Sequence, residues 1–503
     1  MTTTVDHARR VGGVQAWIDS FRPLRQRNFL LVWCAGLISL AGDWMLRVAL
    51  PILVLERTGS VTATSGVVIA GVLPTLLFGS LAGVFVDRWD RRKVMLVTSL
   101  AQALVVLPLV AVSGADTIWV VYAVAFTAAS LSQFFSPAEA ALLPLLVRDA
   151  QLVAANALNA VNNNLARLVG PALGGLLAAW AGLAAVAYVD AVTFVVAAGL
   201  LALVRGRFVA ASAEQAPEPD VQQSDVQQSD VQRSGIGPSG LGRATAAVRT
   251  EFVAGLAFVR RSRVLLVIIS VFTATSIGEG IMGVLFPAYV KEGLRGGVTE
   301  VGWLMSAQAV GGVIGGLVAG WFGSRFSKVR ILCVGSVIFG VIDIVLFTYP
   351  LVWPVFWPAV LLMVLVGIPG VVISAAAMAE IQAAASDVFR GRVFAVAGTS
   401  MGFAAMLGAG LAGTFGDQLG PMVMLVVQGA GFVVAGAAMG ILLGGRAGGR
   451  RTPNQEPTAA EQRTPAEERT PAEERTPGEE RTPGEERTPA ADGAPFPATV
   501  SGG

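Results

Sequence analysis

A few ionisable side chains interrupt the long apolar runs of this 503-residue chain, and these groups could carry protons or bind charge there. Asp43 and Arg47 stand four residues apart in the first run, so both lie on one face of a helix and can pair within it. Glu279 occupies a similar run in the second half, but the residues four positions away are Thr275 and Gly283. Because a carboxylate in hydrocarbon is costly unless it is paired, we expect Arg47 to keep Asp43 ionised and Glu279 to gain and lose protons near neutral pH.

Each of these groups has more than one interpretation. Glu279 is the favoured proton carrier, and a polar contact inside the helix bundle is the alternative. Asp43 and Arg47 form either a polar pair that faces a substrate or a structural ion pair. Arg167, which lies shortly after three consecutive asparagines, could pair with Asp43 across helices or meet an anionic substrate.

The other acids in the apolar runs are expected to have ordinary partners. Asp190 and Asp343 fall nearer the outer ends of their runs, where water or loops can satisfy them. Glu139 lies near the inner end of its run, and we expect a salt bridge from it to a nearby arginine: Arg91, Arg92 or Arg148.

The sequence offers no residue set for a metal, a cofactor or a nucleic acid. The single histidine, His7, lies in the polar N-terminal segment, and Cys34 and Cys333 each lie inside an apolar run. We therefore predict no disulfide, no metal site and no cofactor. A phosphate-binding G-x-x-x-x-G-K-[ST] loop and a cluster of acids and histidines are both missing from the sequence, which argues against an ATP-driven pump and against a membrane enzyme.

The elements that must position these groups are membrane-spanning helices. Hydrophobic residues make up 54% of the chain, charged residues only 14%, and the mean hydropathy is +0.66. Runs of about 20 apolar residues are each long enough to cross a bilayer as a helix. We predict twelve spans: 28–55, 63–86, 94–112, 117–143, 154–180, 183–204, 264–289, 299–323, 329–349, 352–377, 393–416 and 420–444.

The placement of Lys and Arg predicts the orientation of the chain. With the N-terminus in the cytoplasm, the inward segments up to Arg451 hold 26 Lys and Arg and the outward loops hold 3. Positive residues gather on the cytoplasmic side of membrane proteins. We therefore predict a multi-pass protein of the cell membrane with both termini in the cytoplasm.

Composition divides the chain into five parts. A cytoplasmic segment (1–27) precedes an N-terminal six-helix bundle (28–204), and a cytoplasmic linker (205–263) leads to a C-terminal six-helix bundle (264–444). The last part, 445–503, carries a Pro-containing six-residue repeat and is predicted to be disordered. The linker holds a five-residue polar repeat and then an interfacial helix, whose apolar side is formed by Val248, Phe252, Leu256 and Val259.

The two halves of the chain resemble each other at an offset of 236 to 238 residues. "GDWMLRVALP", from Gly42, aligns with "GEGIMGVLFP", from Gly278, and this alignment pairs Asp43 with Glu279. A duplicated six-helix unit explains the match, so we predict two pseudo-symmetric bundles.

Two further motifs have spacings that suggest a function. "GVFVDRWDRRK" places a carboxylate and several bases at the inner end of the second span, and its weaker copy is "GWFGSRFSKVR". "GPALGG" in the fifth span brings small residues to a helix face, which allows close helix packing. The candidate gate residues are Gly83, Asp87, Arg88, Arg91, Arg92 and Arg325, and the candidate packing residues are Gly170, Pro171, Gly174 and Gly175.

These motifs resemble signatures of the major facilitator superfamily. "GVFVDRWDRRK" is similar to its loop between helices 2 and 3, and "GPALGG" is similar to the Gly-Pro signature of its antiporters and drug exporters. "SPAEAALLP" and "RGRVFA" are similar to its macrolide and siderophore exporter branch. The resemblance implies two bundles that rock about a central site, with Asp87 capping a neighbouring helix to lock the cytoplasmic side. Asp90 stands where the family often has Gly, and span 4 lacks an Arg that many drug/proton antiporters carry there.

We therefore expect a monomeric, proton-coupled exporter of a lipophilic small molecule such as a drug, an antibiotic or a siderophore-like metabolite. Its predicted partners are this substrate, protons and the lipid bilayer. A lipid or lysolipid translocator, a metabolite uptake symporter, and a membrane scaffold or sensor are the alternatives.

Overall fold

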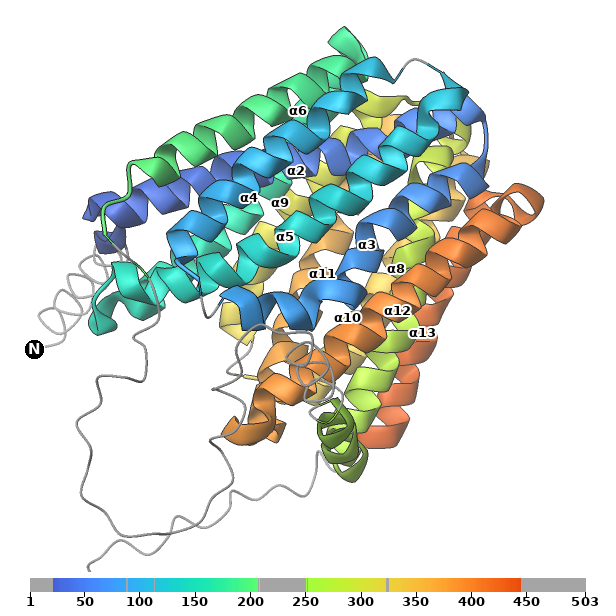
Figure 1. Ribbon diagram of the computed structural model, residues 1–503. Helices are drawn as coiled ribbons and strands as arrows, with labels where there is room; N and C mark the ends of the chain where they lie inside the picture. Colours follow the sequence, from blue (N-terminus) through green and yellow to red (C-terminus); the bar gives the residue numbers. More distant parts are fainter. Residues whose placement is uncertain are drawn as a thin grey trace, which may run out of the picture. The chain divides into compact units, whose positions relative to one another are not determined.

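The computed structural model describes residues 21–86, 89–112, 114–206, 208, 250, 252–322 and 325–444. These ranges are helical with short connections, and they contain no strand (Figure 1). Eleven helices in them are long and apolar enough to cross a membrane. In chain order the long α-helices are α2 (Arg27–Thr58), α3 (Val61–Val86), α4 (Arg91–Val106), α5 (Ile118–Leu146), α6 (Leu152–Ala202), α8 (Arg263–Gly293), α9 (Val298–Phe322), α10 (Lys328–Thr348), α11 (Phe356–Ala384), α12 (Asp387–Leu419) and α13 (Pro421–Gly444).

A single glycine explains how eleven helices provide twelve spans. Gly182, within α6, has φ 75° and ψ 178°, a conformation that side-chain-bearing residues rarely adopt. It divides α6 into two segments that match the predicted spans 154–180 and 183–204. The prediction of an all-α membrane protein with twelve spans is confirmed for the described part of the chain.

The helix ends follow from capping residues in the sequence. The Asp90 side chain accepts hydrogen bonds from the backbone N–H groups of Arg92 and Lys93 and so begins α4. The Ser327 side chain begins α10 in the same way, by accepting from the N–H of Arg330. The two turns that the repeat aligns are therefore each followed by a helix with an N-cap.

The two halves repeat the same packing. In the first half α2 packs mainly on α6, and in the second half α8 packs on α12 and α13. A Cβ added to Gly170 of α6 would lie 2.6 Å from the carbonyl oxygen of Ala41 in α2. Gly408 of α12 meets the carbonyl oxygen of Ile277 in α8 at the equivalent place. The internal repeat in the sequence thus corresponds to a repeated helix contact.

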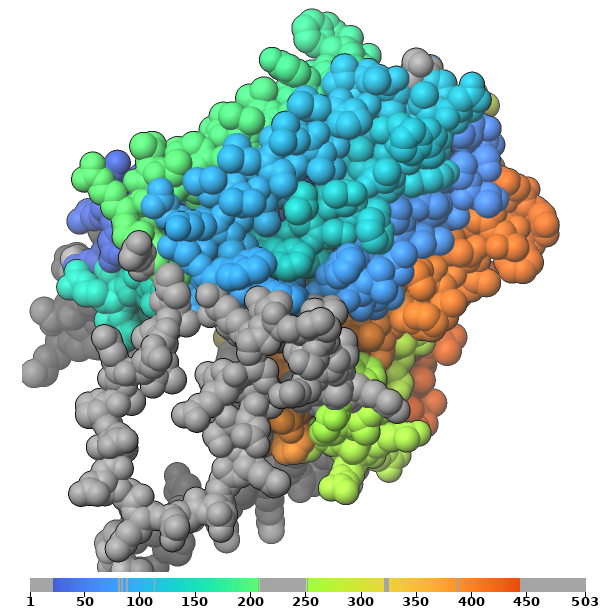
Figure 2. Space-filling view, viewed as in Figure 1, coloured from blue at the N-terminus to red at the C-terminus, as the bar shows by residue number. Residues whose placement is uncertain are grey.

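The halves meet chiefly where α6 packs on α9 and where α3 packs on α12. Figure 2 shows α3 in blue beside α12 in orange. The Thr62 hydroxyl of α3 donates to the Gly413 carbonyl of α12 at 2.5 Å, and the Thr299 hydroxyl of α9 donates to the Gly175 carbonyl of α6 at 3.4 Å. Each of these four residues lies at or near one end of a predicted span. The sequence predicts that these span ends are on the outer side of the membrane.

Residues 1–20, most of the predicted linker and residues 445–503 lie outside the described residues. The apolar side predicted for the interfacial helix is described from Phe252 onward, and residues 252–261 are helical. Val259 is buried, and the Phe258 ring stacks on Phe389 of α12 with centroids 4.7 Å apart. This helix therefore contacts the beginning of α12; its position on a membrane surface stays a prediction.

Candidate functional site

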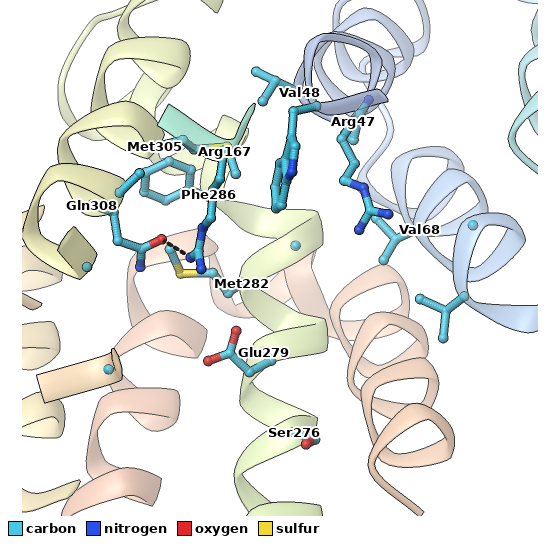
Figure 3. Close-up of a pocket in the computed structure, with 18 of the residues that line it drawn as sticks. Arg47, Val48, Val68, Arg167, Ser276, Glu279, Met282, Phe286, Met305 and Gln308 are labelled. Atoms are coloured by element: carbon cyan, nitrogen blue, oxygen red, sulfur yellow. Dashed lines mark hydrogen bonds between the residues drawn. The ribbon is translucent and has the colours of Figure 1, made fainter. Parts of the chain in front are cut away.

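A cavity of about 700 Å³ lies between the two halves (Figure 3). Its walls come from α2, α3, α5 and α6 of the first half and from α8 to α13 of the second. Most of the lining is apolar, as in pockets that bind small organic molecules. All four residues that the sequence predicts for proton coupling or substrate contact line it, and its polar groups include Asp43, Arg47, Asn164, Arg167, Glu279, Gln308, Asp343 and Gln428.

Arg167 reaches from the first half toward two groups of the second. Its Nη2 donates a hydrogen bond of 2.9 Å to Oε1 of Gln308 on α9, and the Glu279 side chain of α8 lies below this pair in Figure 3. The Arg167 charge acts on the Glu279 carboxylate. The expectation that Glu279 lacks a nearby cation is therefore wrong, because sequence spacing reveals only neighbours on the same helix.

Asp43 and Arg47 both line the cavity but do not form the ion pair that their spacing predicts. No hydrogen bond or salt bridge joins these two described residues, although Arg47 still acts on Asp43 electrostatically. The Arg47 guanidinium instead lies 5.1 Å from the ring centroid of Trp44, and Arg167 lies 5.7 Å from the same centroid. Attraction of cations to an aromatic face accounts for both positions.

The sequence predicts partners from water or loops for Asp190 and Asp343, but both side chains are buried. Asp190 is 0% exposed, and its Oδ1 accepts a hydrogen bond of 3.2 Å from the Thr193 hydroxyl. Asp343 is 2% exposed, and its Oδ2 accepts from Nε2 of Gln428 at 3.4 Å. The partners found among the described residues are side chains of helices and not of loops, so the prediction of loop partners is wrong for both. The internal repeat is the feature of the sequence that could indicate this arrangement, because its offset aligns Asp190 with Gln428.

Glu139 also has different neighbours from those predicted. Its Oε1 faces Gly36 of α2, where the amide nitrogen of Asn162 also approaches. It forms no salt bridge with the three arginines proposed for it, all of which are described. Arg92 instead donates to the carbonyl oxygens of Leu201 and Ala202 at the C-terminal end of α6, at 2.9 and 2.6 Å. A cation at a helix C-terminus is stabilised by the helix dipole.

Comparison with known protein families assigns the two halves separately. Residues 18–224 match a family described as "Transmembrane secretion effector", and residues 268–489 match the "Major Facilitator Superfamily". The multidrug efflux pump Tap of Mycolicibacterium fortuitum is 31% identical over 404 residues, which are 78% of this chain and 90% of that protein. The chain belongs to the major facilitator superfamily. It is therefore a transporter and not an enzyme.

Other relatives and solved structures agree with this assignment. Macrolide efflux protein A of Streptococcus pyogenes is 27% identical over 395 residues, covering 78% of this chain and 90% of that protein. The nucleoside transporter NupG (TM-score 0.63, 12% identity, 83% of this chain and 100% of that one) has a similar fold. A bacterial homologue of the iron transporter ferroportin (TM-score 0.60, 17% identity, 83% and 98%) also has it. At these identities the structures show the fold alone, which is two six-helix bundles.

The major facilitator loop motif is described only in part. Asp87 and Arg88 lie outside the described residues, as does the environment of Gly83 in the last turn of α3. The backbone N–H of Arg91 donates to the Phe208 carbonyl at 3.2 Å. Arg325 lies in the aligned turn between α9 and α10. The gating role that the resemblance implies for this set stays a prediction.

The major facilitator Gly-Pro motif, by contrast, is described completely. Gly170 and Gly174 face α2, where a Cβ on Gly174 would lie 2.7 Å from the Cα of Met45. Gly175 faces α9, where its Cβ would lie 3.2 Å from the Cα of Gly302, and the Pro171 carbonyl abuts the same glycine. This short stretch therefore lies between a helix of its own half and a helix of the other half.

Proposed function

We propose that this major facilitator protein exports lipophilic small molecules, such as macrolide-like drugs, across the cell membrane in exchange for protons. The relatives named as multidrug and macrolide efflux proteins support a drug cargo, and the mainly apolar cavity fits one. The observation that carries proton coupling is that Arg167 of one half faces Glu279 of the other inside this cavity.

A cation and a carboxylate on opposite halves can link proton binding to movement of those halves. When Glu279 is ionised, it attracts Arg167, and this attraction is strong in a cavity with a low effective dielectric. When Glu279 takes up a proton, the attraction is lost and the halves are free to separate at that level. A proton thereby shifts the balance between two arrangements of the halves, which is the requirement for alternating access.

Gln308 is proposed as a positioning residue for this pair. Its Oε1 accepts one N–H of the Arg167 guanidinium at 2.9 Å, and Trp44 lies against the same guanidinium. An arginine held at one N–H by a neutral acceptor keeps its other N–H groups for a carboxylate. We infer that Gln308 directs Arg167 without neutralising it.

Transport in everted membrane vesicles tests the proposal. Cells would express the full chain, and uptake of a radiolabelled macrolide would be driven by an imposed pH gradient. Glu279→Gln should lower the gradient-dependent part of uptake at least about tenfold. Glu292→Gln, which changes an exposed acid at the end of the same helix, should leave it unchanged. Wild-type gradient-driven uptake by the Glu279→Gln variant would refute the proposed role of Glu279.

A further inference from the structure

The second segment of α6 presses a buried carboxylate against α2 beside Asp43. The Asp190 carboxylate lies so close to Gly42 that any larger residue at position 42 would displace it. Asp43, the next residue, acts electrostatically on Asp190. Asp43 lines the cavity, whereas Asp190 is not among the cavity residues. Two carboxylates of the first half therefore stand one behind the other, with only Asp43 facing the cavity.

Asp190 lacks the partners that a buried carboxylate needs when it is ionised. Its Oδ1 accepts one hydrogen bond from Thr193, and its Oδ2 is buried with no hydrogen-bond partner among the described residues. Arg47 acts electrostatically on Asp43 and lies over the Trp44 ring, which Arg167 also approaches. A buried carboxylate and a half-buried neighbour that repel each other are stabilised by a proton or a cation between them.

The helices α4 and α9 and the connection that follows α4 bring no further charge to the level of Asp190. The titratable residues of α4, which packs on α6, are Arg91, Arg92 and Lys93, and all three lie in its first turn. The connection Leu107–Ala111, which also packs on α6, contains none. The contact of α9 with α6 is made around Gly175 and Gly302, before the bend at Gly182, and the single acid of α9 is Glu300 in its first turn.

The second half shows that packing does not require an acid at this position. Gln428, which aligns with Asp190, packs on Gly278 as Asp190 packs on Gly42. The uncharged Gln428 side chain, through its Cγ, thus covers the aligned glycine that the Asp190 carboxylate covers in the first half. The carboxyl group of Asp190 is therefore better explained by binding of a positive species than by helix packing.

We propose that Asp43 and Asp190 form a two-carboxylate site that holds one proton between them. The proton comes from water in the cavity, binds an Asp43 carboxylate oxygen and is shared with the unpartnered oxygen of Asp190. No bond other than the O–H bonds changes. The first half then has its own proton site in addition to Glu279. Proton binding here does not rest on the proposed function, but its use in the transport cycle does.

An infrared titration of the purified full chain in liposomes tests this site without transport. Protonated carboxyl groups give a C=O stretching band that disappears as the group ionises. One component of this band should titrate with a different midpoint in Asp43→Asn and in Asp190→Asn, because each variant leaves the other acid without its partner. The two midpoints in the single variants should differ from that of the wild type by at least about one pH unit, which corresponds to about 1.4 kcal/mol of coupling. Glu279→Gln should leave this component unchanged.

Three results would overturn the proposal. The first is an Asp190 component whose midpoint is the same in Asp43→Asn as in the wild type, which would make the acids independent. The second is a wild-type component that depends on replacing choline by Na⁺ or on adding Mn²⁺, which would assign the pair to a metal ion. The third applies if the Asn variants do not fold: Thr193→Val removes the hydroxyl bonded to Asp190, and an unchanged midpoint in that variant would show that Asp190 does not titrate in this component.

Discussion

The two halves place an acid at the same point of a duplicated scaffold but surround it differently. In the first half Asp43 has a second carboxylate, Asp190, behind it, and its own-helix cation lies over a tryptophan. In the second half Glu279 has the amide Gln428 at the equivalent place, interacts electrostatically with the cavity acid Asp343, and receives its cation, Arg167, from the opposite half. The contrast shows that the repeated backbone fixes where an acid sits, whereas side chains from other helices decide what it can do.

The largest difference between the two halves should appear when the cavity arginines, Arg167 and Arg47, are replaced one at a time. Arg167→Gln removes the cation that faces Glu279 across the halves, so gradient-driven macrolide uptake should fall at least about tenfold, equivalent to about 1.4 kcal/mol. Arg47→Gln removes a cation held mainly against Trp44, and its loss should be smaller than about threefold, on the order of 0.6 kcal/mol by the same conversion. Equal losses in the two variants would contradict the distinction between the halves.

Adding a methyl group at the closest helix contact of each half should lower the stability of the protein to a similar extent. Gly170→Ala and Gly408→Ala each direct a methyl group at a backbone carbonyl of the partner helix, and overpacking of this kind costs about 1–3 kcal/mol. Both variants should therefore lower the melting temperature of the purified protein. Gly199→Ala and Gly410→Ala are the matched controls, because a Cβ there would meet nothing within 4 Å. A drop in only one half would argue that the packing repeat is not energetically equivalent.

Gln308→Ala should have a moderate effect that is specific to the second half. The variant loses a hydrogen bond from a charged guanidinium, worth about 1.5 kcal/mol at the lower end of the usual range, so uptake should fall by up to about tenfold. The pH dependence of uptake should also shift, because Arg167 would no longer be held in place near Glu279. Gln382→Ala changes an exposed glutamine on α11 and serves as the control. A purely structural role would lower uptake at every pH by the same factor.

The smallest expected effects concern the two aligned inner turns. Asp90→Ala removes a side chain that accepts from two backbone N–H groups, and Ser327→Ala removes one that accepts from a single N–H. N-cap losses cost about 0.5–2 kcal/mol, and the Asp90 variant should lie toward the upper end. Thermal unfolding of both variants measures the difference, and a larger loss for Ser327→Ala would contradict it.

Hydropathy alone was enough to predict the helices, because a span needs about 20 apolar residues and little else. The internal repeat also predicted that Asp43 and Glu279 occupy equivalent positions. Periodicity reports only neighbours on one helix, so it paired Asp43 with Arg47 and gave Glu279 no cation. The contact of Arg167 with Gln308 joins residues 141 positions apart and depends on how the bundles pack. The sequence does not predict the burial of Asp190 and Asp343, because the distance of a residue from a helix end does not reveal which face of the helix is buried.

A double-mutant cycle tests the central claim, that Arg167 and Glu279 act as a pair across the halves, most directly. Gradient-driven macrolide uptake would be measured in vesicles with Arg167→Gln, Glu279→Gln and the double variant, and with the protonophore-treated wild type as the baseline. For two residues that act as one unit, the double variant should be no slower than the slower single variant. Losses that multiply, so that the double variant is slower by the product of the two single effects, would contradict the pairing.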